Sequence, residues 1–316
     1  CRPLVAGQRT RIYEEKRSYF MKFFDPHIHM TSRTTDDYVN MYNAGVRALI
    51  EPAFWLGQPR THVESFDDYF QSLVGWEKFR ASQFGIRHFC AICINAKEAN
   101  NEKMADEVLA LVPKYLEKDN VVAVGEIGYD DMTELEHKYF KKQLEIAKEM
   151  ELPVIVHTPH RDKKNGVIAS LKLVKEVGIP ENMVIIDHNT EETLPIVLET
   201  DCWAGHTIYP RSKMDADRMA ELVKQYGSDR IIVNSSADWG VSNPLAVPFT
   251  AELMKKEGIS EEEISKILWH NPIELFSQSG TFTAEEMEEE IEFDQSVLFQ
   301  GNSVLRGQQP EVRKNS

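Results

Sequence analysis

The sequence predicts an α/β protein, a (β/α)8 barrel of the TIM type with a metal site at the carboxyl ends of its strands. Eight short apolar segments alternate with amphipathic helical segments over residues 21–280, which is the usual size of such a barrel. Histidines and acidic residues fall at the ends of several of these segments. Only a barrel brings strands that are distant in sequence round one axis, so we prefer it to a doubly wound open sheet, which would spread them out.

The first half of the alternation holds four predicted strands. A first strand begins at Phe23 and ends at the two histidines His27 and His29, a helix over 35–44 stops at Gly45, and a second strand covers 47–52. Apolar residues at helical spacing predict a helix over 64–82, followed by a strand over 85–94, a long helix over 97–118 and a strand over 121–128. The last of these strands is apolar apart from Glu126, which is typical of a parallel strand buried on both faces.

The second half repeats the pattern. Helices are expected over 133–150, 166–177, 191–199 and 215–226, and strands over 153–157, 183–188, 202–206 and 230–235. After the last strand, Ser260 and Glu263 form a capping box, and Asn271-Pro272 supplies a cap and a first-turn proline. Two short helices therefore close the domain.

The two ends of the chain differ from the barrel in composition. Residues 1–20 contain five basic and two acidic side chains without apolar periodicity, so we expect an extension that precedes the barrel. From 281 the chain is rich in glutamate and then in Gln, Gly, Ser and Asn. We expect residues 281–316 to be an acidic, flexible tail with room for one helical segment, and a partner-binding role for it stays open.

Overall composition restricts the class of partner. The net charge of −15 over 316 residues disfavours non-specific nucleic-acid binding without excluding nucleic acid, and an acidic enzyme can still take a phosphate ester through bound metal ions. Four cysteines are too few for a disulfide framework, and no apolar run reaches the length of a membrane span. We expect a soluble, cytoplasmic protein that acts on a small molecule. The sequence does not determine its oligomeric state.

The pattern Cys90-Ala-Ile-Cys93 has the form of a zinc or redox pair but lies inside an apolar run. Positions i and i+3 of a strand face opposite sides, so we interpret both cysteines as structural.

Six side chains at predicted strand ends are candidate metal ligands. His27 and His29, one residue apart, lie on the same face of an extended segment. The others, each at or near the carboxyl end of another strand, are Glu126, His157, His188 and Asp238. Four imidazoles and two carboxylates exceed what one catalytic ion needs, which predicts two divalent ions of zinc, manganese or magnesium. Glu126 is the natural bridging carboxylate, and a bridged pair of ions lowers the pKa of a shared water.

These residues resemble the motifs of the TatD-type metal-dependent hydrolases, a branch of the amidohydrolase superfamily, over residues 21–280. The segment Asp25-Pro26-His27-Ile28-His29 is similar to the family's first-strand motif, and Gly125-Glu126-Ile127-Gly128 to its Gly-Glu-Ile-Gly. His157 and Asp238 match its fifth-strand histidine and eighth-strand aspartate. Within the family the chain looks most similar to the EboC-like and related uncharacterised members.

The resemblance implies a ligand set and a reaction. It implies one ion held by His27, His29, Glu126 and Asp238, and a second held by Glu126, His157 and His188. It also implies that Asp238 takes the proton from the attacking water.

The chain departs from the family's nucleases around the ligands. It has Thr158-Pro159-His160-Arg161 where they have Ser-Arg after the fifth-strand histidine, and Asp187-His188-Asn189-Thr190 at the sixth strand. We therefore expect a changed substrate and place His160, Arg161 and His206 as substrate-binding candidates, with solvated loop residues as the alternative. Glu51 is either a partner of a ligand histidine or part of an internal charge pair.

The leading hypothesis is a binuclear hydrolase acting on an ester bond, a phosphoester first, of a small molecule. Two alternatives remain: a lactone or amide hydrolase of the amidohydrolase type, and a non-catalytic metal-binding assembly protein.

Overall fold

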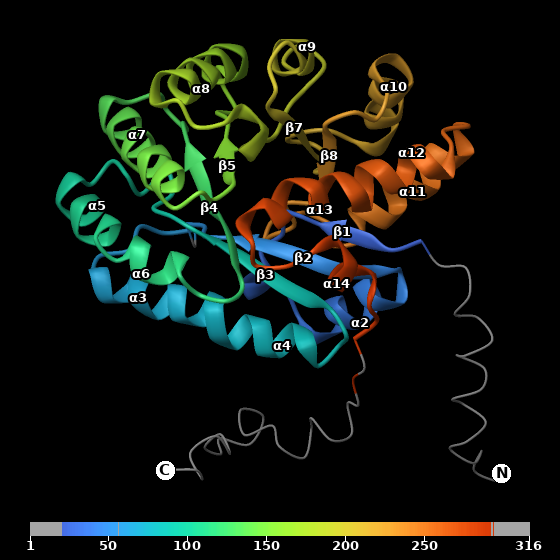
Figure 1. The fold of residues 1–316 in the computed structure, drawn as a ribbon, viewed down its shortest axis with the longest axis horizontal. Coiled ribbons are helices and arrows are strands. Elements are labelled where there is room, and N and C mark those ends of the chain that lie inside the picture. The colour runs from blue at the N-terminus through green and yellow to red at the C-terminus, as the bar shows by residue number, and fades with distance from the viewer. Residues whose placement is uncertain (1–20, 56, 292, 294–316) are drawn as a thin grey trace, which may run out of the picture.

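The structure, a computed structural model, describes residues 21–55, 57–291 and 293 of the chain. Eight parallel strands form one sheet in the order β1 to β8, with helices between them (Figure 1). This is the predicted (β/α)8 barrel. The predicted extension 1–20 and the residues from 294 onward lie outside the described residues.

The strands are short. They are β1 (Phe23–Asp25), β2 (Val46–Pro52), β3 (Arg87–Ile92), β4 (Val121–Gly128), β5 (Val154–His157), β6 (Val184–Ile186), β7 (Trp203–Thr207) and β8 (Ile231–Asn234). The α-helices are α2 (Thr35–Asn43), α3 (Val63–Gln71), α4 (Lys78–Ser82), α5 (Glu102–Leu109), α6 (Val112–Leu116), α7 (Glu134–Glu149), α8 (Lys163–Val177), α9 (Leu194–Leu198), α10 (Ala216–Tyr226), α11 (Ala246–Lys256), α12 (Glu261–Ser265), α13 (Asn271–Phe276) and α14 (Ala284–Glu288). Short 3-10 segments lie at Met30–Ser32, Glu181–Met183 and Ser277–Ser279, and π-helical segments at Ser72–Glu77 and Lys266–His270.

Local chemistry explains where several helices begin and end. The predicted capping box of Ser260 and Glu263 is present at the start of α12, and Thr283 with Glu286 forms another at α14. At α7, the side chain of Thr133 accepts from the backbone N–H of Glu136.

The barrel closes beyond the ends of its first and last strands. The N–H of Ser236 donates to the carbonyl of His27 at 2.7 Å, and the N–H of His29 donates to the carbonyl of Ala237 at 2.9 Å. The segment after β1 and the segment after β8 are thereby joined. This junction lies at the carboxyl ends of the strands, where the candidate ligands were predicted.

Two apolar clusters pack on the two sides of the sheet. The larger fills the space between strands and surrounding helices. The smaller cluster fills the barrel interior toward the amino ends of the strands. It contains inward-facing residues such as Phe24, Phe89 and Trp203, and it continues into α13 and α14. Since the lower interior is packed solid, the open end of the barrel is the carboxyl one.

Two predicted helices are interrupted. The segment expected as one helix over 97–118 forms α5 and α6, separated at Ala110 and Leu111, with Pro113 in the first turn of α6. A proline lacks the N–H that a continuous helix needs at that position. The segment 64–82 is helical throughout but widens into a π-helical turn between α3 and α4.

The expected flexible tail does not begin at 281. The side chains of Phe282 and Met287 are only 5% and 1% exposed, packed in the lower interior cluster. The indole N–H of Trp269 donates to Glu288 at 2.7 Å, and Arg87 donates to the carbonyls of Glu286 and Glu289. Apolar residues spaced five apart within the acidic run bring α14 against the barrel floor, so the boundary at 280 was placed too early.

Among the described residues, no helix combines the length and apolar character that crossing a membrane requires.

Candidate active site

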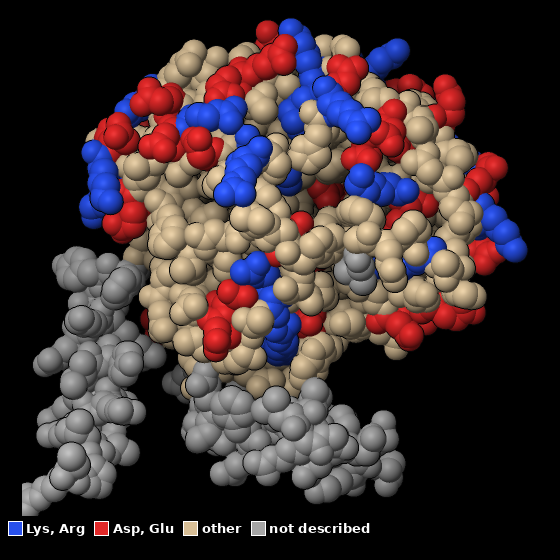
Figure 2. Space-filling view, turned by 180° about the vertical axis from the view of Figure 1, so that it is seen from behind, with Lys and Arg blue, Asp and Glu red and all other residues tan. Residues whose placement is uncertain are grey.

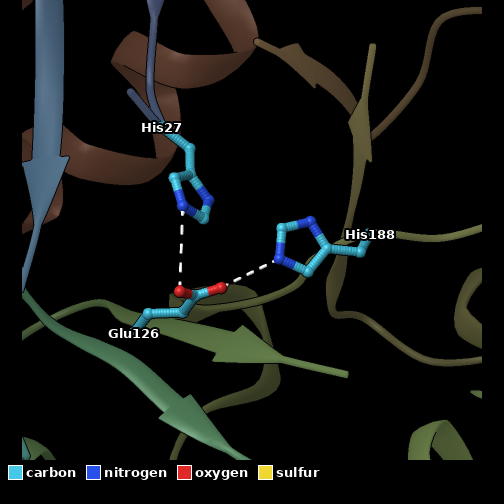
Figure 3. A group of neighbouring side chains, drawn as sticks. All are labelled: His27, Glu126 and His188. Atoms are coloured by element: carbon cyan, nitrogen blue, oxygen red, sulfur yellow. Dashed lines mark hydrogen bonds and ion pairs between the residues drawn. The ribbon is translucent and has the colours of Figure 1, made fainter. Parts of the chain in front are cut away.

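The candidate ligands converge at the carboxyl ends of β1, β4, β5 and β6. His27 and His29 follow β1, Glu126 lies within β4, His157 is the last residue of β5, and His188 follows β6. Ligand atoms of His27, Glu126 and His188 all lie within 4.8 Å of one another, and all three side chains are buried (Figure 3). Residues up to 161 positions apart in sequence therefore face one point.

The two oxygens of the Glu126 carboxylate face different histidines. Oε1 lies 2.8 Å from Nδ1 of His157 and 2.8 Å from Nε2 of His188. Oε2 faces Nε2 of His27 at 3.9 Å (Figure 3). One carboxylate thus stands between two groups of imidazoles, the arrangement expected of a bridging ligand.

His29 completes the group on the Oε2 side. Its Nε2 lies 3.2 Å from Nε2 of His27, and the two rings are nearly perpendicular at 86°. The Nδ1 atom of His29 is buried and has no hydrogen-bond partner among the described residues. Two ring nitrogens that face each other at this separation fit a shared cation.

A carboxylate that the sequence analysis did not single out, Asp187, supports His27 from behind. Its Oδ2 lies 2.6 Å from Nδ1 of His27, and Asn234 donates to both of its oxygens, at 3.0 and 3.1 Å. A carboxylate on the far nitrogen fixes the tautomer and orientation of a ligand imidazole. A Cβ at Gly205 would lie 2.4 Å from Oδ1 of Asp187, so only glycine leaves room for this carboxylate. In the sequence, the position of Asp187 directly before the candidate ligand His188 is the feature that could have identified it.

Asp25 is a second buried carboxylate beneath the histidines. Its Oδ1 accepts from the backbone N–H groups of His27 and Ser235, at 3.3 and 3.1 Å. Burial raises its pKa to about 6 despite these hydrogen bonds. Asp25 joins the two segments that close the barrel.

Electrostatics set the protonation states that a divalent ion requires. Burial, helped by neighbouring positive charge, holds the pKa values of His29 and His188 well below the usual value. Burial alone would raise the pKa of Glu126, but His157 and His27 outweigh it and hold that pKa well below normal. For His157, burial is outweighed by Glu126 and Asp130, which raise its pKa. A charged carboxylate beside the neutral imidazoles of His29 and His188 suits a borderline metal.

Asp238, the remaining candidate ligand, lies in the loop after β8. Its Oδ1 accepts from the hydroxyl of Tyr209 at 3.0 Å and from the N–H of Gly240 at 2.7 Å. None of its contacts among the described residues is with one of the four histidines. Ser236, two residues earlier, contacts Lys213, which lies beside His188.

Lys213 takes the space beside Ser236. Its Nζ lies 3.1 Å from Oγ of Ser236 and 3.5 Å from Nε2 of His188. Burial lowers the pKa of this amine, while Glu126, Asp187 and Asp238 oppose that effect. No pattern in the sequence marks Lys213 as a site residue, because Lys213 lies in the loop after β7, six residues beyond the strand.

His206, expected to bind substrate, faces away from the site. It is fully buried, and its Nδ1 lies 3.2 Å from the carbonyl of Ala204 on its own strand. Neighbouring Thr207 points inward instead, with its hydroxyl 2.7 Å from Nδ1 of His188. Side chains alternate along a strand, so His206 lies on the helix side of the sheet.

His160 and Arg161 are exposed at the rim of a cavity of about 470 Å³ that reaches His188 and Lys213. We call this cavity the cationic pocket, and its lining residues are His160, Arg161, Asp162, Lys163, Lys164, Asn165, His188, Thr190, Glu192, Ser212 and Lys213. Burial lowers the pKa of Lys163 to about 8, and its Nζ donates to the hydroxyl of Thr158 at 2.9 Å. Basic side chains outnumber acidic ones here although the whole chain is acidic.

Glu51 proves to be part of an internal pair. Its Oε2 lies 2.9 Å from Nε2 of His88, and its Oε1 accepts from the N–H of Thr31 at 2.7 Å. Cys90 and Cys93 are both buried, and burial raises their pKa values well above normal. Their inert environment agrees with the structural interpretation.

A buried carboxylate between histidines, at the carboxyl face of a (β/α)8 barrel, defines a metal-dependent hydrolase of the amidohydrolase type. The chain belongs to the TatD related DNase family, whose model matches residues 24–277.

Three relatives illustrate the range of that family. An uncharacterised metal-dependent hydrolase of Methanocaldococcus jannaschii is 29% identical over 250 residues, which cover 78% of this chain and 96% of the relative. The deoxyribonuclease Tat-D of Schizosaccharomyces pombe is 25% identical over 297 residues, covering 79% and 90%. A crystal structure of a TatD-like protein from Archaeoglobus fulgidus superposes with a TM-score of 0.64 at 29% identity, covering 76% of this chain and 94% of that one.

Proposed function

We propose that the protein hydrolyses a phosphoester of a small molecule with the help of two divalent ions of zinc, manganese or magnesium. The main support for this proposal is the position of the Glu126 carboxylate, whose two oxygens face different histidines. The side chains of His27, His29 and Glu126 would hold one ion, and those of Glu126, His157 and His188 the other. When bound, such a pair supplies Lewis acidity and a water of lowered pKa.

The chain's own residues contribute charge and orientation. In the hydrolysis, the water oxygen bonds to phosphorus, the P–O ester bond breaks, and a proton passes to the departing alcohol. Lys213, beside His188, is placed to pair with the negative phosphoryl group, and Arg161 extends the positive charge to the rim. Asp187 keeps the imidazole of His27 oriented toward Glu126.

The charge distribution supports a small substrate. On the face seen in Figure 2, lysine and arginine side chains alternate with aspartate and glutamate, without a broad cationic stripe. A long polyanion needs such a stripe to neutralise successive phosphates. The cationic pocket is instead compact and lies next to the histidines.

The test is a substrate panel with metal-loaded protein: phosphomonoesters, aryl phosphodiesters, lactones, N-acyl amides and single-stranded DNA. We expect metal-dependent turnover of small phosphoesters. Glu126→Gln should lower that turnover by about 100-fold or more and reduce the bound metal measured by elemental analysis. Glu192→Gln, which also lines the pocket but pairs with Lys164 at 3.4 Å, is the matched control and should stay near wild type.

Two results would contradict the proposal. Turnover confined to lactones or amides would keep the metal centre and reject the phosphoester. No turnover, together with a metal content equal to a buffer blank after reconstitution, would favour the non-catalytic alternative.

A further inference from the structure

A row of rings crosses the mouth of the barrel. Trp239 packs on Phe54 with 4.8 Å between ring centroids, and Phe54 stacks on the imidazole of His29 at 3.8 Å and 15°. His27 follows at 5.0 Å from His29, and His188 at 5.3 Å from His27. The row thus runs from an aromatic end, through the candidate metal ligands, to the cationic pocket.

The aromatic end, which we call the aromatic shelf, consists of Phe54 and Trp239. Phe54 follows β2 and Trp239 follows β8, so both stand at the carboxyl face. The side chain of Trp239 is 46% exposed although it neighbours a buried site. Trp55 also packs edge-on against Trp239, with 6.2 Å between the ring centroids, so the exposed ring is part of an aromatic cluster and not an isolated surface residue.

The backbone keeps this ring uncovered. Gly57 has a φ of +85°, and a Cβ built there would lie 3.4 Å from the indole of Trp239. A larger residue at position 57 would therefore strain the backbone, and its Cβ would lie in van der Waals contact with the indole. Glycine leaves the ring accessible.

The two ends of the row differ in chemistry. Lys213, 3.5 Å from His188, marks the end that attracts negative charge. The aromatic shelf carries no charge of its own and offers flat ring surface. A ligand that spans the row needs an anionic group at one end and a planar ring at the other.

We propose that the aromatic shelf stacks against a planar ring of the substrate, and that the substrate is a phosphoester of a ring-bearing alcohol or phenol. The phosphoryl group lies toward Lys213 and the ring toward Trp239. This inference rests on the proposed function and adds the nature of the group esterified to phosphate. Trp239 is a specificity-determining residue in this arrangement.

Binding of unreactive phosphonates separates the two proposals. Metal-loaded protein is titrated by calorimetry with methylphosphonate, cyclohexylphosphonate and phenylphosphonate, which share the anionic group and differ in the attached group. We expect phenylphosphonate to bind about tenfold more tightly than cyclohexylphosphonate, as stacking of a flat ring on an aromatic side chain predicts. Phenylphosphonate should also quench tryptophan fluorescence.

Three variants complete the design. Trp239→Ala should abolish the preference for phenylphosphonate over cyclohexylphosphonate while leaving methylphosphonate affinity and metal content unchanged. Trp239→Phe should keep most of that preference. Phe249→Ala, which removes a 55% exposed aromatic on α11 at the other end of the barrel, should change nothing.

The outcomes are distinguishable. Methylphosphonate binding without a flat-ring preference, or a preference that survives Trp239→Ala, would overturn the role of the shelf alone. No phosphonate binding at all would overturn the proposed function and this inference together. A preference seen with aryl phosphates but not with a mononucleotide would identify the ring as a simple aryl group, and tight binding of single-stranded DNA alone would reject the small-molecule substrate.

Discussion

At the scale of single residues, Asp238 is a candidate ligand whose hydrogen bonds in the structure are made within its own loop and to Tyr209. Its carboxylate holds the hydroxyl of Tyr209 and the N–H of Gly240 and so shapes the loop after β8. A Cβ at Gly240 would lie 2.9 Å from the same carboxylate, which shows how tightly that loop is packed around it.

We therefore expect Asp238→Asn to act on the loop rather than on the metal. The amide oxygen of asparagine still accepts hydrogen bonds but without charge, so the free energy of unfolding should fall by about 1 kcal/mol. Elemental analysis should find the metal content unchanged, and Asp187→Asn, which weakens the support of His27, should lower it. Loss of metal in Asp238→Asn would show that its carboxylate reaches the centre after all.

His206 provides a prediction about pH. Burial lowers its pKa to about 4, whereas an unfolded histidine titrates near 6.5. Between these values the unfolded state binds more protons than the folded state, so stability is complete above pH 6.5 and falls as the pH drops toward 4. The loss attributable to this residue is at most roughly 3 kcal/mol.

Urea unfolding at several pH values between 4 and 7, in the presence of a chelator, measures this dependence. His206→Gln should flatten the curve relative to wild type. His270→Gln, at an exposed histidine, should leave the curve unchanged. Parallel curves for wild type and His206→Gln would mean that folding does not lower the pKa of His206.

At the scale of elements, α14 is the helix whose role differs most from expectation. Phe282 and Met287 lie in the lower interior cluster, and Glu286 and Glu289 hold Arg87 through their carbonyls. The glutamates between these apolar residues made the segment look like a solvated tail. A helix can be acidic on its outer face and still close a barrel with two apolar side chains.

Truncation tests this closure directly. A chain ending at residue 280 should lose about 5 kcal/mol or more of unfolding free energy relative to one ending at 293, because two buried apolar side chains are removed. Phe282→Ala alone should cost about 3–5 kcal/mol. Glu285→Ala, at an exposed position of the same helix, should stay within about 0.5 kcal/mol of wild type. Equal stability of the two truncated chains would remove α14 from the folded core.

The segments flanking the strands explain which parts of the site the sequence could predict. His27, His157, His188 and Glu126 lie within two residues of a strand end, so the sequence pattern was sufficient to place them at the carboxyl face. After β8, Ser236 with its φ of +43° interrupts the extended backbone, so the period of the strand does not determine where the side chain of Asp238 points. Lys213 comes from a loop, whose path a local pattern does not determine.

At the scale of the whole molecule, the barrel was predictable because eight short apolar segments alternate with helical segments along the chain. The inward or outward direction of each strand was harder to predict. His206 was placed one residue out of phase on β7, since a strand buried on both faces shows no polar alternation.

Because the candidate ligands come from β1, β4, β5 and β6, bound metal should connect distant parts of the barrel. A ligand that binds only the folded state stabilises it by about 2.7 kcal/mol at one hundred times its Kd. Chelation should therefore lower the thermal midpoint by roughly 5–10 °C. Calorimetry with and without chelator measures the shift, and Glu126→Gln should show almost none. A midpoint that chelator leaves unchanged in wild type would indicate that the site is empty.

The face of the barrel at the amino ends of the strands also determines how the protein can be immobilised or fused. Lys22, at the start of the described chain, pairs with Glu288 at 3.0 Å, and Phe293 contacts Tyr42 beside the start of β2. Both ends of the described chain thus lie near the amino ends of the strands, whereas the histidines lie at or beyond the carboxyl ends. A bead, sensor chip or fused carrier joined beyond either end would hold the molecule with its mouth toward the solution.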